Sequence, residues 1–371
     1  MGGDNSDIAV LLVVMAMRFI VPLFIPRFPL PAILAALVID AADQTIFQKF
    51  TDLNLDGYQN YDKALDIFYL TIAFLAVYRN WTNTTSINVA RFLWYYRLIG
   101  VWLFEMFQAR WILFVFPNTF EFFFIAYAAI RTQWDPRRLT DRAVIGLAAC
   151  IWIFIKLPQE WWIHIAQNDF TDFMKVDVFG TSPTTSWGDA ITNRPAVTIA
   201  LLTAIGLLSV TAVWGLRRAP QRDWSFRVDV DKPIPHIDLP DRPQRSLWIA
   251  PPFAEKLLLI GLLAAIFTSV LNIDTPIYRI VIGTMLIIAA SVGVSEWLSR
   301  RGIEWSSIGV EFVVLVGINS AVIGLYSALL GDRVNRSLVL FFGLLLTMVI
   351  VLYDRFTGER AEREPIDPAF S

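Results

Sequence analysis

The chain has few charged residues for its length, and this scarcity restricts the fold class. Only 17% of its 371 residues are charged, whereas 56% are hydrophobic and the mean hydropathy is +0.53. A water-exposed surface needs more charge than this, so two soluble domains are disfavoured. We expect an all-α, polytopic transmembrane helical bundle whose main partner is the lipid bilayer. Lys and Arg (31) nearly balance Asp and Glu (33), which excludes an overall basic nucleic-acid binder.

Cysteine and histidine are also scarce, which excludes several kinds of site. A single cysteine, Cys150, rules out a disulfide framework and any cysteine-based zinc or iron-sulfur centre. With only two histidines, His164 and His236, a bis-histidine haem or a histidine-rich metal centre in the membrane is strongly disfavoured. The chain has no P-loop, dinucleotide glycine motif or nucleophile elbow. We therefore expect no cofactor and no bound metal.

About eleven apolar segments qualify as membrane spans, because a hydrocarbon core about 30 Å thick needs about 20 mostly apolar residues. They are residues 8 to 28, 30 to 48, 62 to 78, 88 to 116, 118 to 132, 143 to 167, 195 to 215, 253 to 272, 276 to 298, 307 to 330 and 337 to 353. The residues before the first segment are acidic and small rather than basic, so we expect a retained span and not a cleaved signal peptide. The expected location is a cell membrane, most simply a bacterial inner membrane.

The distribution of Lys and Arg predicts an orientation. Basic residues gather in residues 131 to 142, in residues 216 to 250, at Arg300 with Arg301, and in the tail from Arg355. Eleven spans place these four segments on one side of the membrane. Cytoplasmic loops carry the excess of Lys and Arg, so the N-terminus is expected outside and the C-terminus inside.

The sequence divides into three parts. Residues 1 to 215 are predicted to form a transmembrane bundle with a polar core, and residues 216 to 250 a proline-rich, charged cytoplasmic linker. Residues 251 to 371 are predicted to form scaffold helices with a short cytoplasmic tail. In this last part the charged residues lie near the segment ends, so Glu255 and Lys256 are expected to snorkel to the interface. Asn319 is its one deep polar residue and is expected to form an interhelical hydrogen bond.

The first part differs, because its charged residues recur on helix faces at membrane depth. Lys156, Glu160 and His164 recur every four residues. Further charged residues accompany this stripe. Arg97 and Glu105 share a face of the segment 88 to 116, and Asp40 and Asp43 share a face of the segment 30 to 48. Glu121 lies near the outer end of the fifth segment. Pro158 falls inside the stripe and is expected to kink or break the helix.

The cost of burying charge decides how this pattern is interpreted. A charged side chain at the centre of a bilayer is unfavourable by about 2.5 to 3.5 kcal/mol, so these residues cannot face lipid. They either form structural ion pairs or line a water-filled cavity. We expect a polar cavity open to the outside, with Arg97 and Lys156 as its floor.

Three classes of function fit this pattern. The first is a transporter or channel-like protein that moves a proton, a cation or a small polar solute. The second is an intramembrane transferase acting on a lipid-linked substrate at the outer leaflet, with aspartates or Glu160 and His164 as the base. The third is a non-catalytic assembly subunit, in which the charged residues pair with no cavity between them. The sequence leaves open whether the protein is an enzyme and carries no signal for an oligomeric state.

Overall fold

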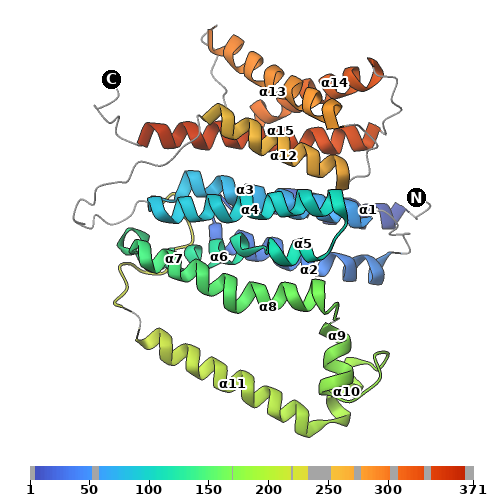
Figure 1. Ribbon diagram of the computed structural model, residues 1–371, viewed down its shortest axis with the longest axis vertical. Helices are drawn as coiled ribbons and strands as arrows, with labels where there is room; N and C mark the ends of the chain where they lie inside the picture. Colours follow the sequence, from blue (N-terminus) through green and yellow to red (C-terminus); the bar gives the residue numbers. More distant parts are fainter. Residues whose placement is uncertain are drawn as a thin grey trace.

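The computed structural model describes residues 5–51, 58–168, 170–218, 220–232, 252–270, 277–300, 308–329 and 336–363. Throughout these residues the secondary structure is helical, and they contain no strand. Most of the long helices run roughly parallel or antiparallel to one another, and the two chain ends lie at opposite ends of these helices (Figure 1). The predicted all-α class is therefore confirmed.

The first four long helices lie in the middle of the molecule, between the last four helices and the arm (Figure 1). They are α1 (Asn5–Ile20), which continues into the 3-10 turn Val21–Phe24, α2 (Pro29–Phe50), α3 (Tyr58–Asn80) and α4 (Thr84–Phe107). Local sequence sets several of these ends: α2 begins on Pro29, a residue suited to a first helical turn, and the Asn83 side chain caps α4 by accepting from Ser86 N.

The chain then forms a broken helix and a long irregular one. The broken helix consists of α5 (Trp111–Val115) and α6 (Thr119–Arg131), joined by three residues that include Pro117. The long helix consists of α7 (Asp141–Cys150), a π-helical stretch Ile151–Lys156, α8 (Leu157–Glu160) and a second π-helical stretch Trp161–Ile165. Sequence analysis assigned residues 111 to 115 to the segment 88 to 116. In the structure they form α5, the first half of the broken helix.

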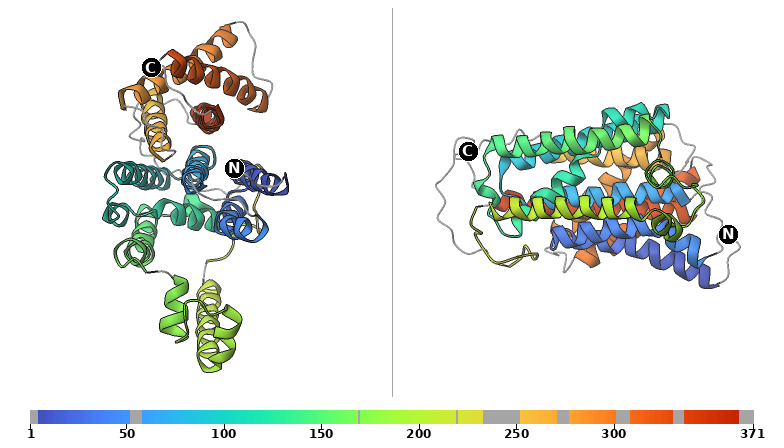
Figure 2. Two further views of the ribbon diagram at one scale, coloured as in Figure 1. Left: turned by 90° about the vertical axis from the view of Figure 1, so that its right-hand side faces the viewer. Right: turned by 90° about the horizontal axis from the view of Figure 1, so that it is seen from below.

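An arm follows that projects away from the other helices (Figures 1 and 2). It contains α9 (Phe170–Phe173), a third π-helical stretch Met174–Val178, α10 (Trp187–Asn193) and α11 (Pro195–Arg217). The chain bends by 98° between α10 and α11. The described side chains of α11 are largely exposed, as expected of a helix that faces lipid.

The last four helices pack as a layer on the first ones. They are α12 (Pro252–Val270), α13 (Ile277–Arg300), α14 (Ile308–Leu329) and α15 (Arg336–Arg363). Contacts of α12 with α4, and of α15 with α3, join the two groups of helices. Within this layer the fully buried Asn319 donates to Ser291 Oγ (3.2 Å) and Thr347 Oγ1 (3.0 Å), so the expected interhelical hydrogen bond is confirmed.

The expectation that Glu255 and Lys256 snorkel is wrong. Both side chains are buried because the first turn of α12 packs inside the bundle. Glu255 accepts from Arg91 Nη2 (3.2 Å) and from the hydroxyls of Tyr78 and Tyr95, and Lys256 pairs with Asp354 of α15 at 2.7 Å. These contacts tie the last four helices to α3 and α4.

Part of the segment 216 to 250 is described, up to Lys232; the remainder of this predicted linker, from residue 233, lies outside the described residues. The described part runs along the loop after α6. Trp224 Nε1 donates to Arg131 O (3.1 Å), Arg227 N donates to Thr132 O (2.8 Å), and Arg138 pairs with Asp223 (2.9 Å). This stretch of chain is therefore held against the end of the bundle.

In the described part of the chain, four helical stretches are long and apolar enough to cross a membrane, or five if the bent pair in the arm counts as one span. The four are Ser6–Phe24, Trp111–Arg131, Asp141–Ile165 and Phe341–Arg360. Several apolar helices that could span a bilayer are thus present, as an integral membrane protein requires.

Gly100 of α4 allows the broken helix to approach closely. A Cβ atom built on Gly100 would lie 2.1 Å from Cβ and 2.6 Å from Cγ of Phe116, which is a severe overlap. Phe116 therefore packs directly on the backbone of α4. Gly146 of α7 differs, since a Cβ there meets nothing within 4 Å.

We therefore expect Gly100→Ala to destabilise the protein by about 1 to 3 kcal/mol, the usual cost of overpacking. Gly146→Ala is the matched control and should leave stability unchanged or raise it, because alanine favours a helix more than glycine does. Thermal unfolding of the two purified variants in detergent measures this difference. Equal melting temperatures for the Gly100→Ala variant and the wild type would contradict the close packing of Phe116.

Candidate functional site

Arg18 of α1 is the centre of a group of carboxylates, which we call the aspartate cluster. Its guanidinium forms ion pairs with four aspartates: Asp40 and Asp43 of α2, and Asp62 and Asp66 of α3. The side chain of Arg18 is only 3% exposed, and Asp43 is also buried. Asp40, Asp62 and Asp66 are partly exposed, so this side of the cluster is open to a surface of the described structure.

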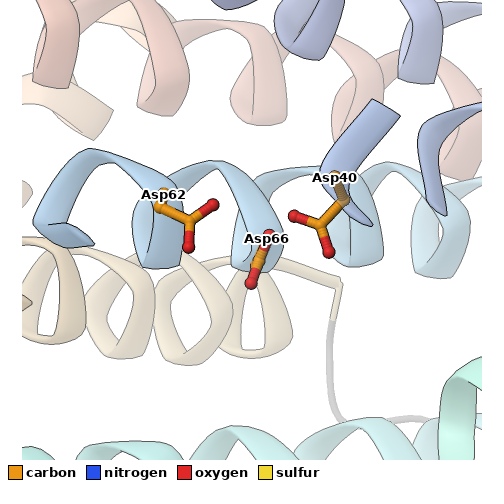
Figure 3. A group of neighbouring side chains, drawn as sticks. All are labelled: Asp40, Asp62 and Asp66. Atoms are coloured by element: carbon orange, nitrogen blue, oxygen red, sulfur yellow. The ribbon is translucent and has the colours of Figure 1, made fainter. Parts of the chain in front are cut away.

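Four carboxylates around one guanidinium give the aspartate cluster an excess of negative charge. One oxygen each of Asp40, Asp62 and Asp66 lies within 4.8 Å of the other two (Figure 3). Like charges this close favour proton uptake, because two ionised carboxylates repel each other. The same three oxygens could also ligate a cation, which would have to share them with Arg18. The sequence predicted Asp40 and Asp43 as a pair but missed Arg18, whose place in the first span was the available signal.

A second group of polar residues forms a hydrogen-bonded series, which we call the glutamate network. It comprises Tyr69 of α3, Asn118 and Glu121 at the start of α6, Glu160 of α8 and His164. Tyr69 Oη donates to Glu121 Oε1 (2.7 Å), and Asn118 Nδ2 donates to Glu121 Oε2 (2.8 Å). Asn118 N donates to Glu160 Oε1 (3.2 Å), and Glu160 Oε2 lies 3.0 Å from His164 Nε2.

Tyr69 joins the two groups. It lies three residues after Asp66 on α3, and residues at this spacing share a helix face. Tyr69 also interacts electrostatically with both Asp66 and Asp40. A series of titratable groups therefore extends from the partly exposed aspartate cluster, through the buried Glu121 and Glu160, to His164, whose side chain is 19% exposed.

Two cations lie beside the glutamate network without touching a carboxylate. Lys156 donates to Gln159 Oε1 (3.1 Å), and its ammonium lies 4.1 Å from the centroid of the Phe122 ring. Arg97 donates from Nη1 to the backbone oxygen of Phe116 (3.0 Å). Both interact electrostatically with Glu121 and Glu160. Sequence analysis named Arg97 and Lys156 as the floor of a cavity, and the structure places them beside two of its predicted carboxylates.

Glu105 is directed elsewhere. Its carboxylate lies 3.5 Å from Lys63 Nζ, near the end of α4. The charged side chains of α4 thus contact three different partners. Glu105 pairs with Lys63, Arg97 donates to the break between α5 and α6, and Arg91 pairs with Glu255. Eight residues were named from sequence. Three of them belong to the glutamate network (Glu121, Glu160 and His164), and two lie beside it (Lys156 and Arg97). Two more belong to the aspartate cluster (Asp40 and Asp43), and Glu105 pairs separately.

The helix that carries Lys156, Glu160 and His164 is not broken at Pro158. Asp141–Ile165 is one continuous helical stretch, with π-helical turns on both sides of the proline. The N–H of Leu157 bonds to Trp152 O, five residues earlier, so the wider turn accommodates a proline that lacks an N–H. π-Helical turns of this kind are frequent at functional sites.

Aromatic rings lie between the glutamate network and the Glu255 group along α3. Phe74 of α3, Trp94 of α4 and Phe120 of α6 pack together, with ring centroids 5.4 to 6.2 Å apart. Phe74 follows Tyr69 and also contacts Tyr78 and Tyr95, which donate to Glu255. An apolar layer thus separates the glutamate network from the Glu255 group.

Comparison with protein-family models, with curated proteins and with solved structures gives no match to this chain.

We expect Arg18→Gln to cost about 3 to 5 kcal/mol of stability, since removing one partner of a buried ion pair leaves the other charges uncompensated. The loss should shrink as the pH is lowered from about 8 to about 5, because protons then neutralise the aspartates that Arg18 balanced. Arg110→Gln, which removes an exposed arginine, should be neutral at every pH. The melting temperatures of both variants and the wild type across this pH range test the prediction. An Arg18→Gln variant that melts like the wild type, or whose loss of stability does not change with pH, would be inconsistent with the aspartate cluster.

Proposed function

We propose that the protein is a multi-pass membrane protein that moves a proton or a cation through the polar core formed by α1 to α8 and the π-helical stretch Trp161–Ile165 that follows α8. The topology proposed with it is eleven spans, with the N-terminus outside and the C-terminus in the cytoplasm of a cell membrane. Two observations support this topology. The positive-inside pattern favours it, and the chain ends lie at opposite ends of the helices (Figure 1). An odd number of spans requires this separation.

The glutamate network is the observation that carries the proposal. Buried carboxylates and an imidazole joined by hydrogen bonds at membrane depth are typical of proton relays and ion pathways. Glu121 and Glu160 are buried, while the two ends of the titratable series are partly exposed. A proton that enters at either end can therefore reach a buried carboxylate.

Each member of the network has a chemical role in this proposal. His164 exchanges protons with solvent, since its imidazole is partly exposed and can bind and release a proton. Glu160 takes the proton from His164 across their 3.0 Å contact. Asn118 holds Glu160 through its N–H and Glu121 through its amide, but it cannot carry a proton, so transfer between the two carboxyl groups needs a bridging water. Arg97 and Lys156 stabilise the ionised form of both carboxylates.

Proton flux into proteoliposomes tests the proposal. Full-length protein is reconstituted around a trapped pH-sensitive dye, a pH gradient is imposed, and the initial rate of internal pH change is measured. We expect Glu160→Gln to reduce this rate at least about tenfold, because glutamine keeps the shape of the side chain but cannot bind a proton.

Asp177→Asn is the matched control, since Asp177 is an exposed carboxylate in the arm. It should conduct like the wild type. Flux that is equal in the wild type, in Glu160→Gln and in protein-free vesicles would refute the proposal and favour a non-catalytic assembly subunit.

A further inference from the structure

The break between α5 and α6 leaves backbone donors without partners. The N-cap residue Asn118 makes no side-chain cap: its Oδ1 has no partner, while its Nδ2 donates to Glu121. Asn118 N bonds to Glu160, and Thr119 N bonds to Pro117 O (2.8 Å). The next two N–H groups, of Phe120 and Glu121, lie in the first turn of α6, where no helical carbonyl precedes them as an acceptor. No described side chain caps them. A helix start with free N–H groups favours negative charge.

Buried side-chain donors without acceptors surround the same break. The hydroxyl of Thr119, a residue that is 1% exposed, has no hydrogen-bond partner. The indole N–H of Trp94, which is also 1% exposed, has none either. The Trp94 ring packs on Phe120, one residue beyond Thr119. An indole N–H can only donate. A buried donor without an acceptor is costly, so these two groups point to an acceptor between the helices.

Arg97 and Lys156 flank the break from two sides. Arg97 contacts Phe116, just before the break, and Lys156 lies over Phe122, just after it. Lys156 is 3% exposed, and no described carboxylate lies within 4 Å of either cation. Each makes one hydrogen bond to the protein, although a guanidinium offers five donors and an ammonium three. Buried cations are normally paired, so both have donors left for a ligand.

We infer that the α5–α6 break, between Arg97, Lys156 and Thr119, is a binding site for an oxyanion, either a carboxylate or a phosphate group. The site resembles the half-helix start that holds anionic substrate groups in transporters with discontinuous helices. Asn118 Oδ1, a buried acceptor without a partner, suits a protonated oxygen of this ligand or a water. The inference rests on the proposed function, because it makes the oxyanion the solute whose movement is coupled to the proton.

Charge balance predicts the coupling. The titratable groups that face the site are Arg97 of α4, Glu121 of α6, Lys156, Glu160 and His164 of the long helix, and Tyr69, Asp66 and Asp40 from α3 and α2. The two cations already balance Glu121 and Glu160. A bound anion therefore adds an uncompensated negative charge unless a proton arrives with it. Binding linked to one proton strengthens about tenfold for each unit by which the pH falls.

Equilibrium binding of radiolabelled phosphate and acetate to the purified full-length protein tests the inference. Arg97→Gln and Lys156→Met should weaken binding about tenfold or more, the loss expected when a charged hydrogen-bond donor is removed. Thr119→Val, which keeps the side-chain shape, should also weaken it, whereas Arg110→Gln and Asp177→Asn, which change exposed residues outside the site, should bind like the wild type. Thermal unfolding establishes that each variant is folded. Thr119→Val keeps the test decisive if a charge-removing variant does not fold.

Short-chain phosphatidylglycerol, measured beside free phosphate and acetate, distinguishes the source of the oxyanion. If short-chain phosphatidylglycerol binds with the same variant pattern and free phosphate and acetate do not, the oxyanion site stands and its ligand is a lipid headgroup. The inference is overturned if no probe binds, or if all variants bind equally.

Proton flux with and without the anion separates the two proposals. Binding with the predicted variant pattern, combined with no proton flux in either buffer, would overturn the proposed function and leave the binding site standing. Proton flux that is unaffected by the anion, combined with no binding, would overturn the site alone. Flux that the anion stimulates, and that Thr119→Val loses, would support both.

Discussion

A charged side chain inside a bilayer must meet an opposite charge or water, and this requirement organises the whole structure. Arg18 is buried among four aspartates from two neighbouring helices, so it fixes how α1, α2 and α3 come together. Glu121 and Glu160 are buried at the start of α6 and in α8, and Asn118 holds both. The helices of the first part therefore pack around buried polar contacts, in addition to the usual apolar ones.

The same requirement is met differently in the two parts of the chain. In the last four helices the described buried charges form closed pairs: Lys256 contacts Asp354 directly, and Glu255 is enclosed by Arg91 and two tyrosine hydroxyls. Such contacts fix helix positions and leave nothing for a ligand. Around the α5–α6 break, by contrast, Thr119 and Trp94 keep unused donors. We propose the binding site at this break because the cations Arg97 and Lys156, which lie within 4 Å of no described carboxylate, flank those donors.

Sequence periodicity predicted the helices well, because a long apolar run in a membrane protein has few alternatives to a helix. Each of the eleven predicted segments overlaps a helix of the structure, although the segment 88 to 116 runs past the end of α4 into α5. What the sequence could not supply was contact between segments. Arg18 was missed because its partners lie 22 to 48 residues away along the chain. Pro158 predicted a kink or break, because a proline normally interrupts an α-helix; the π-helical turns that accommodate it have no recognisable signal in a single sequence.

The candidate site was partly predictable for the same reason. Lys156, Glu160 and His164 lie on one helix, so their spacing alone placed them together. Glu105 shares a helix face with Arg97 but lies about two turns away, and at that distance a neighbour from α3 decided its partner. Residues that act through their position at the break, such as Asn118 and Thr119, have no charge to mark them. They became visible only when the helix was seen to stop at Val115 and start again at Thr119.

The central claim is that the charged groups of the first part face a water-accessible interior while the opposite faces of the same helices meet lipid. Because Cys150 is the chain's only cysteine, Cys150→Ser gives a cysteine-free background in one step. Single cysteines are then placed by Asn118→Cys, beside Glu160, and by Phe154→Cys, on a side chain that is 75% exposed and predicted to face lipid. Reaction with a small, water-soluble, cationic thiol reagent in sealed vesicles should modify the cysteine at position 118 and spare the one at position 154. Rapid modification at 154 with none at 118 would contradict the account.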